Sequence, residues 1–213
     1  MPTNTLNIAT CLKNNALQFP NKKAIIYPIG THKDGTIKYG HKTYRELDTE
    51  SDQYARGFES AGITKGTKTL FMVKPGPDLF SITFALFKVG AIPVIVDPGL
   101  GVKRMLHCFN AVNAEAFIGI KRAHIFRLLL ARHFKSVKTW VTVGKRLFWG
   151  GYSLKKLAKQ KTDTFPIAHT DKDGLALINF TTGSTGPAKG VEYTHAMINK
   201  EYQSLKLNYY DDP

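Results

Sequence analysis

The sequence predicts an α/β fold, in which a mainly parallel sheet is flanked by helices and preceded by an N-terminal hairpin. Two observations carry this prediction. Between residues 67 and 120, short apolar runs alternate with segments of helical periodicity, which is typical of parallel strands joined by right-handed crossovers. Earlier in the chain, residues 23–27 and 36–39 have strand character and are separated by the turn Lys33-Asp-Gly35, which predicts a hairpin.

Length and composition place the chain among ordinary globular proteins. Its 213 residues, 43% hydrophobic and 22% charged, are enough to bury a sizeable core. Cys11 and Cys108 lie far apart and match no metal-ligand spacing, which indicates a reducing compartment and no bound structural metal. No signal-peptide pattern opens the chain, and no apolar run approaches the ~20 residues of a membrane span. We therefore expect a cytoplasmic protein.

Residues 1–66 are expected to form a lead-in of helix, hairpin and helix. The first helix covers Leu6 to Phe19 and ends at Pro20, because proline cannot continue a helix. Thr43-Tyr-Arg-Glu46 matches a capping box and predicts a second helix through Ala61, ended by Gly62.

Residues 67–174 are expected to form the strand and helix units. The predicted strands are 69–73, 91–96, 116–120 and 137–143, and the predicted helices are 77–89 and 103–112. The helix Ala123 to Phe134 follows, with one broad apolar side and basic residues elsewhere (apolar: Ile125, Phe126, Leu128, Leu129, Leu130; basic: Arg122, Arg127, Arg132, Lys135). Such a helix is compatible with burial against the sheet or with an anionic membrane surface. Residues 150–164 are expected to be a linker and a polar helix.

Residues 175–195 form the segment on which the functional interpretation depends. The apolar run Leu175-Ala-Leu-Ile-Asn-Phe180 continues into Thr181-Thr-Gly-Ser-Thr-Gly-Pro-Ala-Lys-Gly190. This pattern predicts a buried strand that ends in a phosphate-binding loop, because glycines let backbone N–H groups approach an anion and the hydroxyls and Lys189 add further donors. The loop is not a Walker A motif, since Lys189 is followed by Gly190 and not by Ser or Thr.

This loop resembles the signature loop of the adenylate-forming superfamily, which contains acyl-CoA synthetases, luciferases and peptide-synthetase adenylation domains. The chain departs from the family pattern at Thr182, where Ser is usual, and at Ala188, where Pro is usual. The resemblance identifies residues 1–213 as part of the large N-terminal AMP-binding domain of such an enzyme. It covers less than half of a typical member, whose ribose-binding acid, hinge and C-terminal domain with a catalytic lysine lie outside these residues.

A second block narrows the resemblance. Residues 72–101 and 115–124 are most similar to the fatty-acyl ligases of olefin biosynthesis, which act as β-lactone synthetases. The implied reaction is attack of a fatty or 3-hydroxy fatty carboxylate on the α-phosphorus of ATP, which gives an acyl-adenylate and pyrophosphate, with Mg²⁺ sharing the phosphate charge. Coenzyme A or a carrier protein is an implied acceptor.

The resemblance assigns roles to loop residues. Lys189 is the expected catalytic residue, and the expected ATP-binding residues are Thr181, Thr182, Gly183, Ser184, Thr185, Gly186, Lys189 and Gly190. His195 follows the loop, and it is expected either to pack at the start of the next helix or to form a wall of the substrate pocket. Thr194 is expected to cap that helix. Asp97-Pro-Gly99 is expected to be a structural turn at the end of a strand, and His32, His41, His107 and His169 are expected on the surface.

The chain is strongly basic, with 30 Lys and Arg against 16 Asp and Glu and a formal charge of +14. The excess is concentrated between Ala116 and Thr162, where the sequence contains no acidic residue. This stretch is compatible with a solvated face or with an anionic membrane surface. No nucleic-acid motif accompanies the charge, so we expect no nucleic-acid partner.

Two functions therefore stay open at this stage. The first is an adenylate-forming ligase of which these residues are the N-terminal part, inactive in isolation. The alternative is a non-catalytic nucleotide-binding or membrane-surface fragment, or the remnant of a broken gene.

Overall fold

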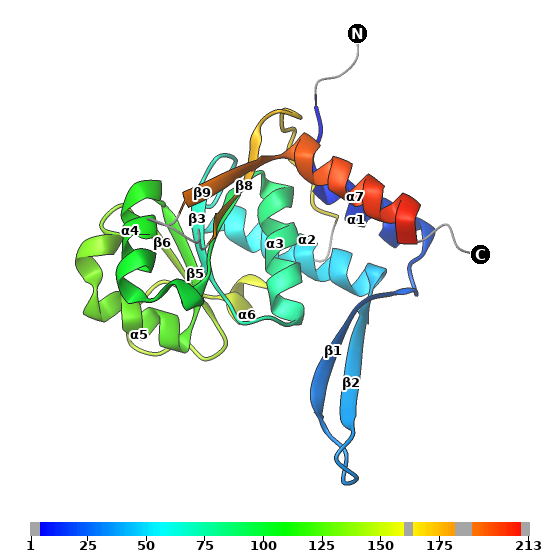
Figure 1. Ribbon diagram of the computed structural model, residues 1–213, viewed down its shortest axis with the longest axis horizontal. Coiled ribbons are helices and arrows are strands. Elements are labelled where there is room, and N and C mark those ends of the chain that lie inside the picture. The colour runs from blue at the N-terminus through cyan, green and yellow to red at the C-terminus, as the bar shows by residue number, and fades with distance from the viewer. Residues whose placement is uncertain (1–4, 160–163, 182–188, 210–213) are drawn as a thin grey trace.

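The computed structural model describes residues 5–159, 164–181 and 189–209. Its first part consists of helix α1 (Ala9–Gln18), the hairpin strands β1 (Lys23–Thr31) and β2 (Ile37–Thr43), and helix α2 (Tyr44–Ser60). The two strands pair only with each other, in antiparallel register, and the hairpin projects away from the rest of the molecule (Figure 1). The predicted lead-in of helix, hairpin and helix is confirmed, although the first helix begins at Ala9 and not at Leu6.

A seven-stranded sheet forms the centre of the molecule, with the strand order β7-β6-β5-β3-β4-β8-β9. Every neighbouring pair is parallel except β8 and β9. The strands are β3 (Lys68–Met72), β4 (Ile92–Val96), β5 (Ala116–Ile120), β6 (Thr139–Val143), β7 (Tyr152–Ser153), β8 (Leu175–Thr181) and β9 (Lys189–Thr194). The predicted fold class, an α/β fold with a mainly parallel sheet and an N-terminal hairpin, is confirmed.

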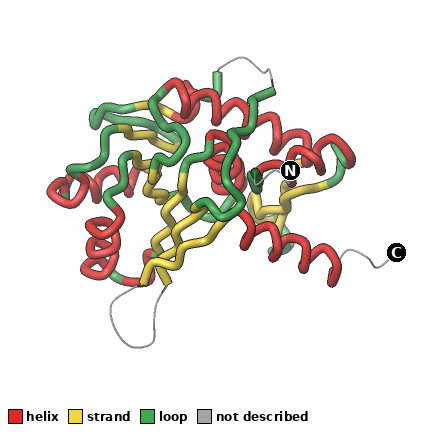
Figure 2. The backbone as a smooth tube through the Cα atoms, turned by 90° about the horizontal axis from the view of Figure 1, so that it is seen from above, coloured by secondary structure: helices red, strands yellow, loops and turns green. Residues whose placement is uncertain are grey.

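Helices cover both faces of this sheet (Figure 2). We call the first covering the α2–α3 layer; it contains α2, α3 (Pro77–Val89) and the short α6 (Leu154–Leu157), which pack on one face around Phe71, Ile118 and Val141. The other covering, the α4–α5 layer, contains α4 (Val102–Val112), α5 (Lys121–Leu129) and the 3₁₀ turn Ala131–Phe134. These elements pack on the opposite face around Phe117.

Local sequence signals explain where the helices begin and end. The Thr43 hydroxyl accepts a hydrogen bond from the Glu46 amide at 3.3 Å, and the Glu46 carboxylate accepts one from the Thr43 amide at 2.8 Å, so the predicted capping box is present. Helix α3 begins with Pro77 and ends before Gly90, which has φ 74°, a left-handed conformation that glycine adopts without strain. Both limits of α3 agree with the prediction.

A buried ion network joins α1, α2 and α3. The Lys88 side chain is completely buried, and its Nζ lies 2.7 Å from Asp48 Oδ1 and 2.5 Å from Asp52 Oδ1. Lys13 of α1 reaches the second Asp48 carboxylate oxygen at 2.9 Å. Two cations therefore face two carboxylates, which is the arrangement that makes burial of these charges tolerable.

Helix α5 differs from the prediction. The helix ends at Leu129, and Leu130 separates it from the 3₁₀ turn, so residues 123–134 do not form one helix. Its buried face holds Ala123, His124 and Arg127, whereas Ile125, Leu128 and Leu129 are exposed. The predicted apolar side therefore does not pack as a unit against the sheet.

Polar contacts explain this orientation of α5. The His124 ring lies 3.1 Å from the Val141 carbonyl and accepts a hydrogen bond from Arg127 Nε at 3.3 Å. The Arg127 guanidinium donates to the Trp149 carbonyl at 3.2 Å and lies over the Trp140 ring at 4.0 Å. Because these polar groups find partners, their burial costs little, and they occupy the inner face in place of leucine.

The described residues 150–159 also differ from the linker and polar helix that we predicted for 150–164. Tyr152 and Ser153 form β7, which pairs in parallel with β6 at the edge of the sheet, and α6 is a single short turn. The predicted surface positions of His32, His41, His107 and His169 are confirmed.

Candidate functional site

The predicted phosphate-binding loop lies, in the sequence, between two strands that pair with each other. Strand β8 pairs in antiparallel register with β9, and Thr181, the last residue of β8, lies opposite Lys189, the first residue of β9. Both residues are exposed. The predicted ligands Thr182, Gly183, Ser184, Thr185 and Gly186 lie outside the described residues. The structure thus brings the first and the last side chain of the predicted site together, and β9 is a strand that sequence reasoning missed.

Strand β8 ends at the edge of the sheet where ligands bind in open α/β folds. Strand β8 is parallel to β4, so Thr181 lies at the same edge as the turn that follows Val96. In this turn the Asp97 carboxylate accepts a hydrogen bond from the Gly99 amide at 2.8 Å. Asp97 therefore has the structural role that the sequence predicts.

Gly190 has a packing requirement. A Cβ atom at this position would lie 3.0 Å from the Phe180 ring and 3.4 Å from Ile178 Cγ2. Since the contact with Phe180 is tighter than an ordinary van der Waals distance, glycine lets β9 pack closely over this side chain of β8. The close pairing in turn fixes the position of Lys189 beside Thr181.

His195 anchors the start of α7 (His195–Tyr209). Its ring is 2% exposed, its Nδ1 accepts a hydrogen bond from the Ile8 amide at 3.3 Å, and Phe87 contacts it edge-on at 6.3 Å between centroids. Burial lowers the pKa of His195 to about 4, so the ring is neutral at pH 7. The Thr194 hydroxyl accepts from the Met197 amide at 3.2 Å, which confirms the predicted cap. His195 thus packs at the helix start, and its other expected role, as a wall of the substrate pocket, stays a prediction.

An apolar cavity of about 590 Å³ opens at the carboxyl ends of β3, β4 and β5. Its walls include Phe71, Leu79, Ile95, Met105 and Phe126. A more polar hollow of about 520 Å³ lies beside it, with Lys74, Lys121, Arg122, Lys145 and Asp78 among its lining residues. Strands β4 and β5 lie on opposite sides of β3 in the sheet. Both openings therefore lie at a topological switch point, where ligands commonly bind. The order of the predicted strands could have indicated this place; the identity of the lining residues could not be read from the sequence.

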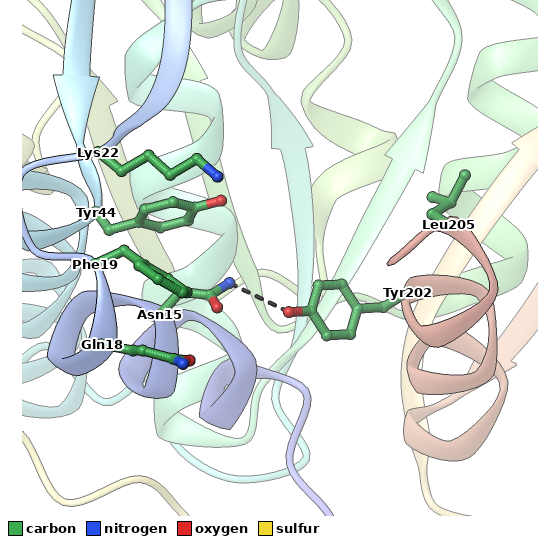
Figure 3. A pocket seen from close by; sticks show the side chains of 7 residues that line it. All are labelled: Asn15, Gln18, Phe19, Lys22, Tyr44, Tyr202 and Leu205. Carbon is green, nitrogen blue, oxygen red and sulfur yellow. Dashed lines mark hydrogen bonds between the residues drawn. The ribbon is translucent and has the colours of Figure 1, made fainter. Parts of the chain in front are cut away.

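A third cavity, of about 320 Å³, lies between α1, the base of the hairpin and α7 (Figure 3). The Asn15 amide donates to the Tyr202 hydroxyl across it at 3.2 Å. Tyr202 and Leu205 come from α7, which follows the last residue of β9, whereas Thr181 and Lys189 lie at the opposite end of the β8 and β9 pair. This cavity therefore does not belong to the phosphate site.

The described residues contain neither a cluster of metal ligands nor a membrane-spanning helix. Within residues 5–159, 164–181 and 189–209, no group of three His, Cys, Asp or Glu side chains could hold a metal ion. In the same ranges, none of the helices is both long and apolar enough to cross a membrane.

Comparison with known proteins identifies the family. The sequence profile of the AMP-binding enzyme family matches residues 12–212. The chain belongs to this family. Among curated AMP-binding relatives, the olefin beta-lactone synthetase of Stenotrophomonas maltophilia is 43% identical over 203 residues, which cover 93% of the chain and 36% of the relative. The olefin beta-lactone synthetase of Xanthomonas campestris is 40% identical over 206 residues, which cover 96% of the chain and 37% of the relative.

Solved structures of AMP-binding and related ligases share the fold. The anthranilate CoA ligase AuaEII, solved with anthranoyl-AMP, superposes with a TM-score of 0.80 at 18% identity over 98% of the chain and 38% of that structure. A long-chain-fatty-acid-CoA ligase of Archaeoglobus fulgidus superposes with a TM-score of 0.75 at 23% identity over 95% of the chain and 39% of that structure. The chain thus spans little more than a third of the length of these relatives, and its sheet and lead-in correspond to one part of their fold.

Proposed function

We propose that this AMP-binding chain takes part in the ATP-dependent activation of a fatty acid, or of a 3-hydroxy fatty acid, as an acyl-adenylate. One observation carries the proposal: the loop sequence Thr181-Thr-Gly-Ser-Thr-Gly-Pro-Ala-Lys-Gly190 joins two paired strands at the carboxyl edge of the sheet. This arrangement offers backbone amides, hydroxyls and one ammonium group to the phosphates of a nucleotide.

The chemistry requires charge stabilisation more than it requires a protein nucleophile. A carboxylate is a poor electrophile, and its attack on the α-phosphorus of ATP gives a mixed anhydride with a good leaving group. The protein positions the two reactants and neutralises the charge that develops on the phosphates. In our proposal Lys189 supplies the positive charge, and Thr181 is the first of the hydroxyl donors.

Mg²⁺ fits this proposal as an ion that arrives with the nucleotide. The described residues contain no acidic cluster for it, and Mg²⁺ commonly binds through substrate phosphates with few protein ligands. The ion would share the phosphate charge with Lys189. The β-lactone in the names of the two synthetase relatives is the internal ester of a 3-hydroxy acid, so these names favour a 3-hydroxy acid among the substrates that we propose. Coenzyme A, a carrier protein or an internal hydroxyl is the acceptor that we propose to test.

Removal of the Lys189 ammonium group tests the proposal. A charge-assisted contact contributes roughly 1.5–3 kcal/mol, so Lys189→Ala should weaken Mg-ATP binding at least several-fold in isothermal titration calorimetry. Lys200→Ala, an exposed lysine on α7, is the matched control and should bind Mg-ATP as the parent chain does. Equal affinities of the Lys189→Ala variant and the parent would contradict the assignment.

A second candidate function is nucleotide binding without catalysis. It is the alternative for these residues tested by themselves, because they correspond to 36% and 37% of the two synthetases that they match. We expect the 213-residue chain to bind Mg-ATP without detectable ATP–pyrophosphate exchange over a panel of fatty and 3-hydroxy fatty acids. Measurable exchange by the pure chain would instead show that these residues suffice for the adenylation step.

A further inference from the structure

Helix α5 and the loop after β6 present large apolar side chains to solvent. Leu129 is 79% exposed, Ile125 42% and Leu128 40%, and Phe148 of the loop is 85% exposed. Single exposed apolar residues are normal on a protein surface, but three on two turns of one helix are a patch. We call Ile125, Leu128, Leu129 and Phe148 the apolar ridge.

Contacts on the inner face of α5 fix the orientation of the apolar ridge. His124 and Arg127, on the inner face of α5, are tied to Val141 and Trp149, so the helix cannot rotate to bury its leucines without breaking these bonds. Trp149 stacks on His124 with ring centroids 5.3 Å apart, and Phe148 contacts Trp149 edge-on. The exposed ring of Phe148 is therefore anchored beside α5 by its neighbour.

All charged side chains on the helices and the loop that carry the apolar ridge are positive. Neither α4 nor α5 contains an acidic residue, and the sequence between Asp97 and Glu115 and the stretch from Ala116 to Thr162 contain none. The exposed cations on this side are Lys103, Arg104, Lys121, Arg122, Arg132, Lys135, Lys145 and Arg146. Four acidic groups of other segments lie near this layer: Asp78 and Asp97, which line the openings at the sheet edge, Glu115, which precedes β5, and Glu192 of β9, which lines a hollow together with His107 and Ala111 of α4.

We propose that the α4–α5 layer is a docking surface for an anionic lipid bilayer. Apolar side chains that protrude and are ringed by lysine and arginine suit an interface, because the apolar groups enter the boundary with the acyl chains while the cations remain with the anionic headgroups. A protein partner of ordinary affinity would instead need a shaped, mainly uncharged centre. This assignment goes beyond the proposed adenylation and does not depend on it.

Vesicle flotation of the full chain tests the proposal. The chain should float with vesicles of mixed phosphatidylcholine and phosphatidylglycerol, should stay in solution with phosphatidylcholine alone, and should be released as the salt concentration rises, because salt screens the attraction. Binding of equal strength to both vesicle types, or to neither, would overturn the proposal.

Two substitutions locate the contact. Leu129→Glu should weaken binding to the anionic vesicles at least fivefold, and the double change Lys121→Glu with Arg132→Glu should weaken it more strongly, since each cation near an anionic surface contributes roughly a fivefold factor. All three side chains are exposed, so the variants should keep the circular dichroism and melting temperature of the parent. That measurement separates a lost contact from a lost fold.

Matched controls introduce the same types of substitution, leucine to glutamate and two cations to glutamate, at exposed positions away from the apolar ridge. Leu17→Glu, at a residue of α1 that is 74% exposed, and Lys33→Glu with Lys38→Glu, in the hairpin, should leave vesicle binding unchanged or nearly so. If the controls weaken binding as much as the ridge variants, the attraction is a general effect of net charge and the docking surface is wrong. Concentration-dependent self-association that Leu129→Glu abolishes, without any vesicle binding, would assign the ridge to a second copy of the chain and also overturn the proposal.

Discussion

The two helical layers on either side of the sheet bury their polar side chains by different means. In the α2–α3 layer, Lys88 is buried as a cation against the carboxylates of Asp48 and Asp52. In the α4–α5 layer, the buried groups are His124 and Arg127, and their partners are carbonyls, one hydroxyl and aromatic rings. One layer uses complete ion pairs, and the other satisfies hydrogen bonds without any carboxylate.

The distribution of acidic residues explains the difference. Helix α2 contains Glu46, Asp48, Glu50, Asp52 and Glu59, whereas α4 and α5 contain none. A layer without carboxylates cannot neutralise its cations internally, so most of them lie on its surface. The same composition that leaves Arg127 to backbone and aromatic partners thus produces the basic face around the apolar ridge.

Among the substitutions that test this difference between the layers, loss of the Lys88 ammonium group should lower the free energy of unfolding most. Lys88→Met leaves two buried carboxylates facing Lys13 alone, and breaking a buried pair from one side costs about 3–5 kcal/mol. Urea denaturation at pH 7 should show a loss of this size in the free energy of unfolding. Adding Asp52→Asn to Lys88→Met should restore part of the loss, because one fewer charge is left unpaired.

The matched control lies in the other layer. Lys103 is an exposed lysine of α4, and Lys103→Met should change the free energy of unfolding by no more than about 0.5 kcal/mol. If the two methionine variants were equally stable, the ion network would contribute nothing, and the contrast between the layers would be one of composition only.

The sequence predicted correctly those helices and strands whose ends are set by residues close by in the chain. Helix α3 has the predicted bounds because Pro77 starts it and Gly90 ends it, and the capping box fixes the start of α2. Strands β3, β4 and β5 follow from short apolar runs between turns. The predicted loop could be recognised for a similar reason, since its glycines, hydroxyls and Lys189 are contiguous.

The features that escaped prediction depend on partners far along the chain. Burial of Lys88 requires Asp48, which lies 40 residues earlier. The rotation of α5 depends on Trp149, 22 residues after Arg127, so helical periodicity alone could not decide whether its apolar side is buried or exposed. Strand β9 is mostly exposed, and therefore lacks the apolar alternation by which strands are recognised.

The neutral polar network of the α4–α5 layer is tested by the pH dependence of stability. The expected change in the free energy of unfolding is smaller than that for Lys88. Burial is the main reason that the pKa of His124 is lowered to about 4. In the unfolded chain the ring gains a proton near its ordinary pKa of about 6.5, whereas in the folded chain it does so only near 4. The unfolded state therefore binds more protons between these values, and the free energy of unfolding should fall as the pH drops from about 6.5 to about 4.

The variant His124→Gln isolates this contribution. It removes the titrating ring but keeps a side chain that can donate and accept, so it should lower the loss of stability over that pH range by roughly 2–3 kcal/mol relative to the parent. The remaining loss should include that of His195, whose pKa is also lowered to about 4. His107→Gln, at an exposed position of α4, should keep the parent profile. An unchanged slope in the His124→Gln variant would mean that the ring is not held neutral by burial, and Arg127 would then need a partner other than a neutral imidazole.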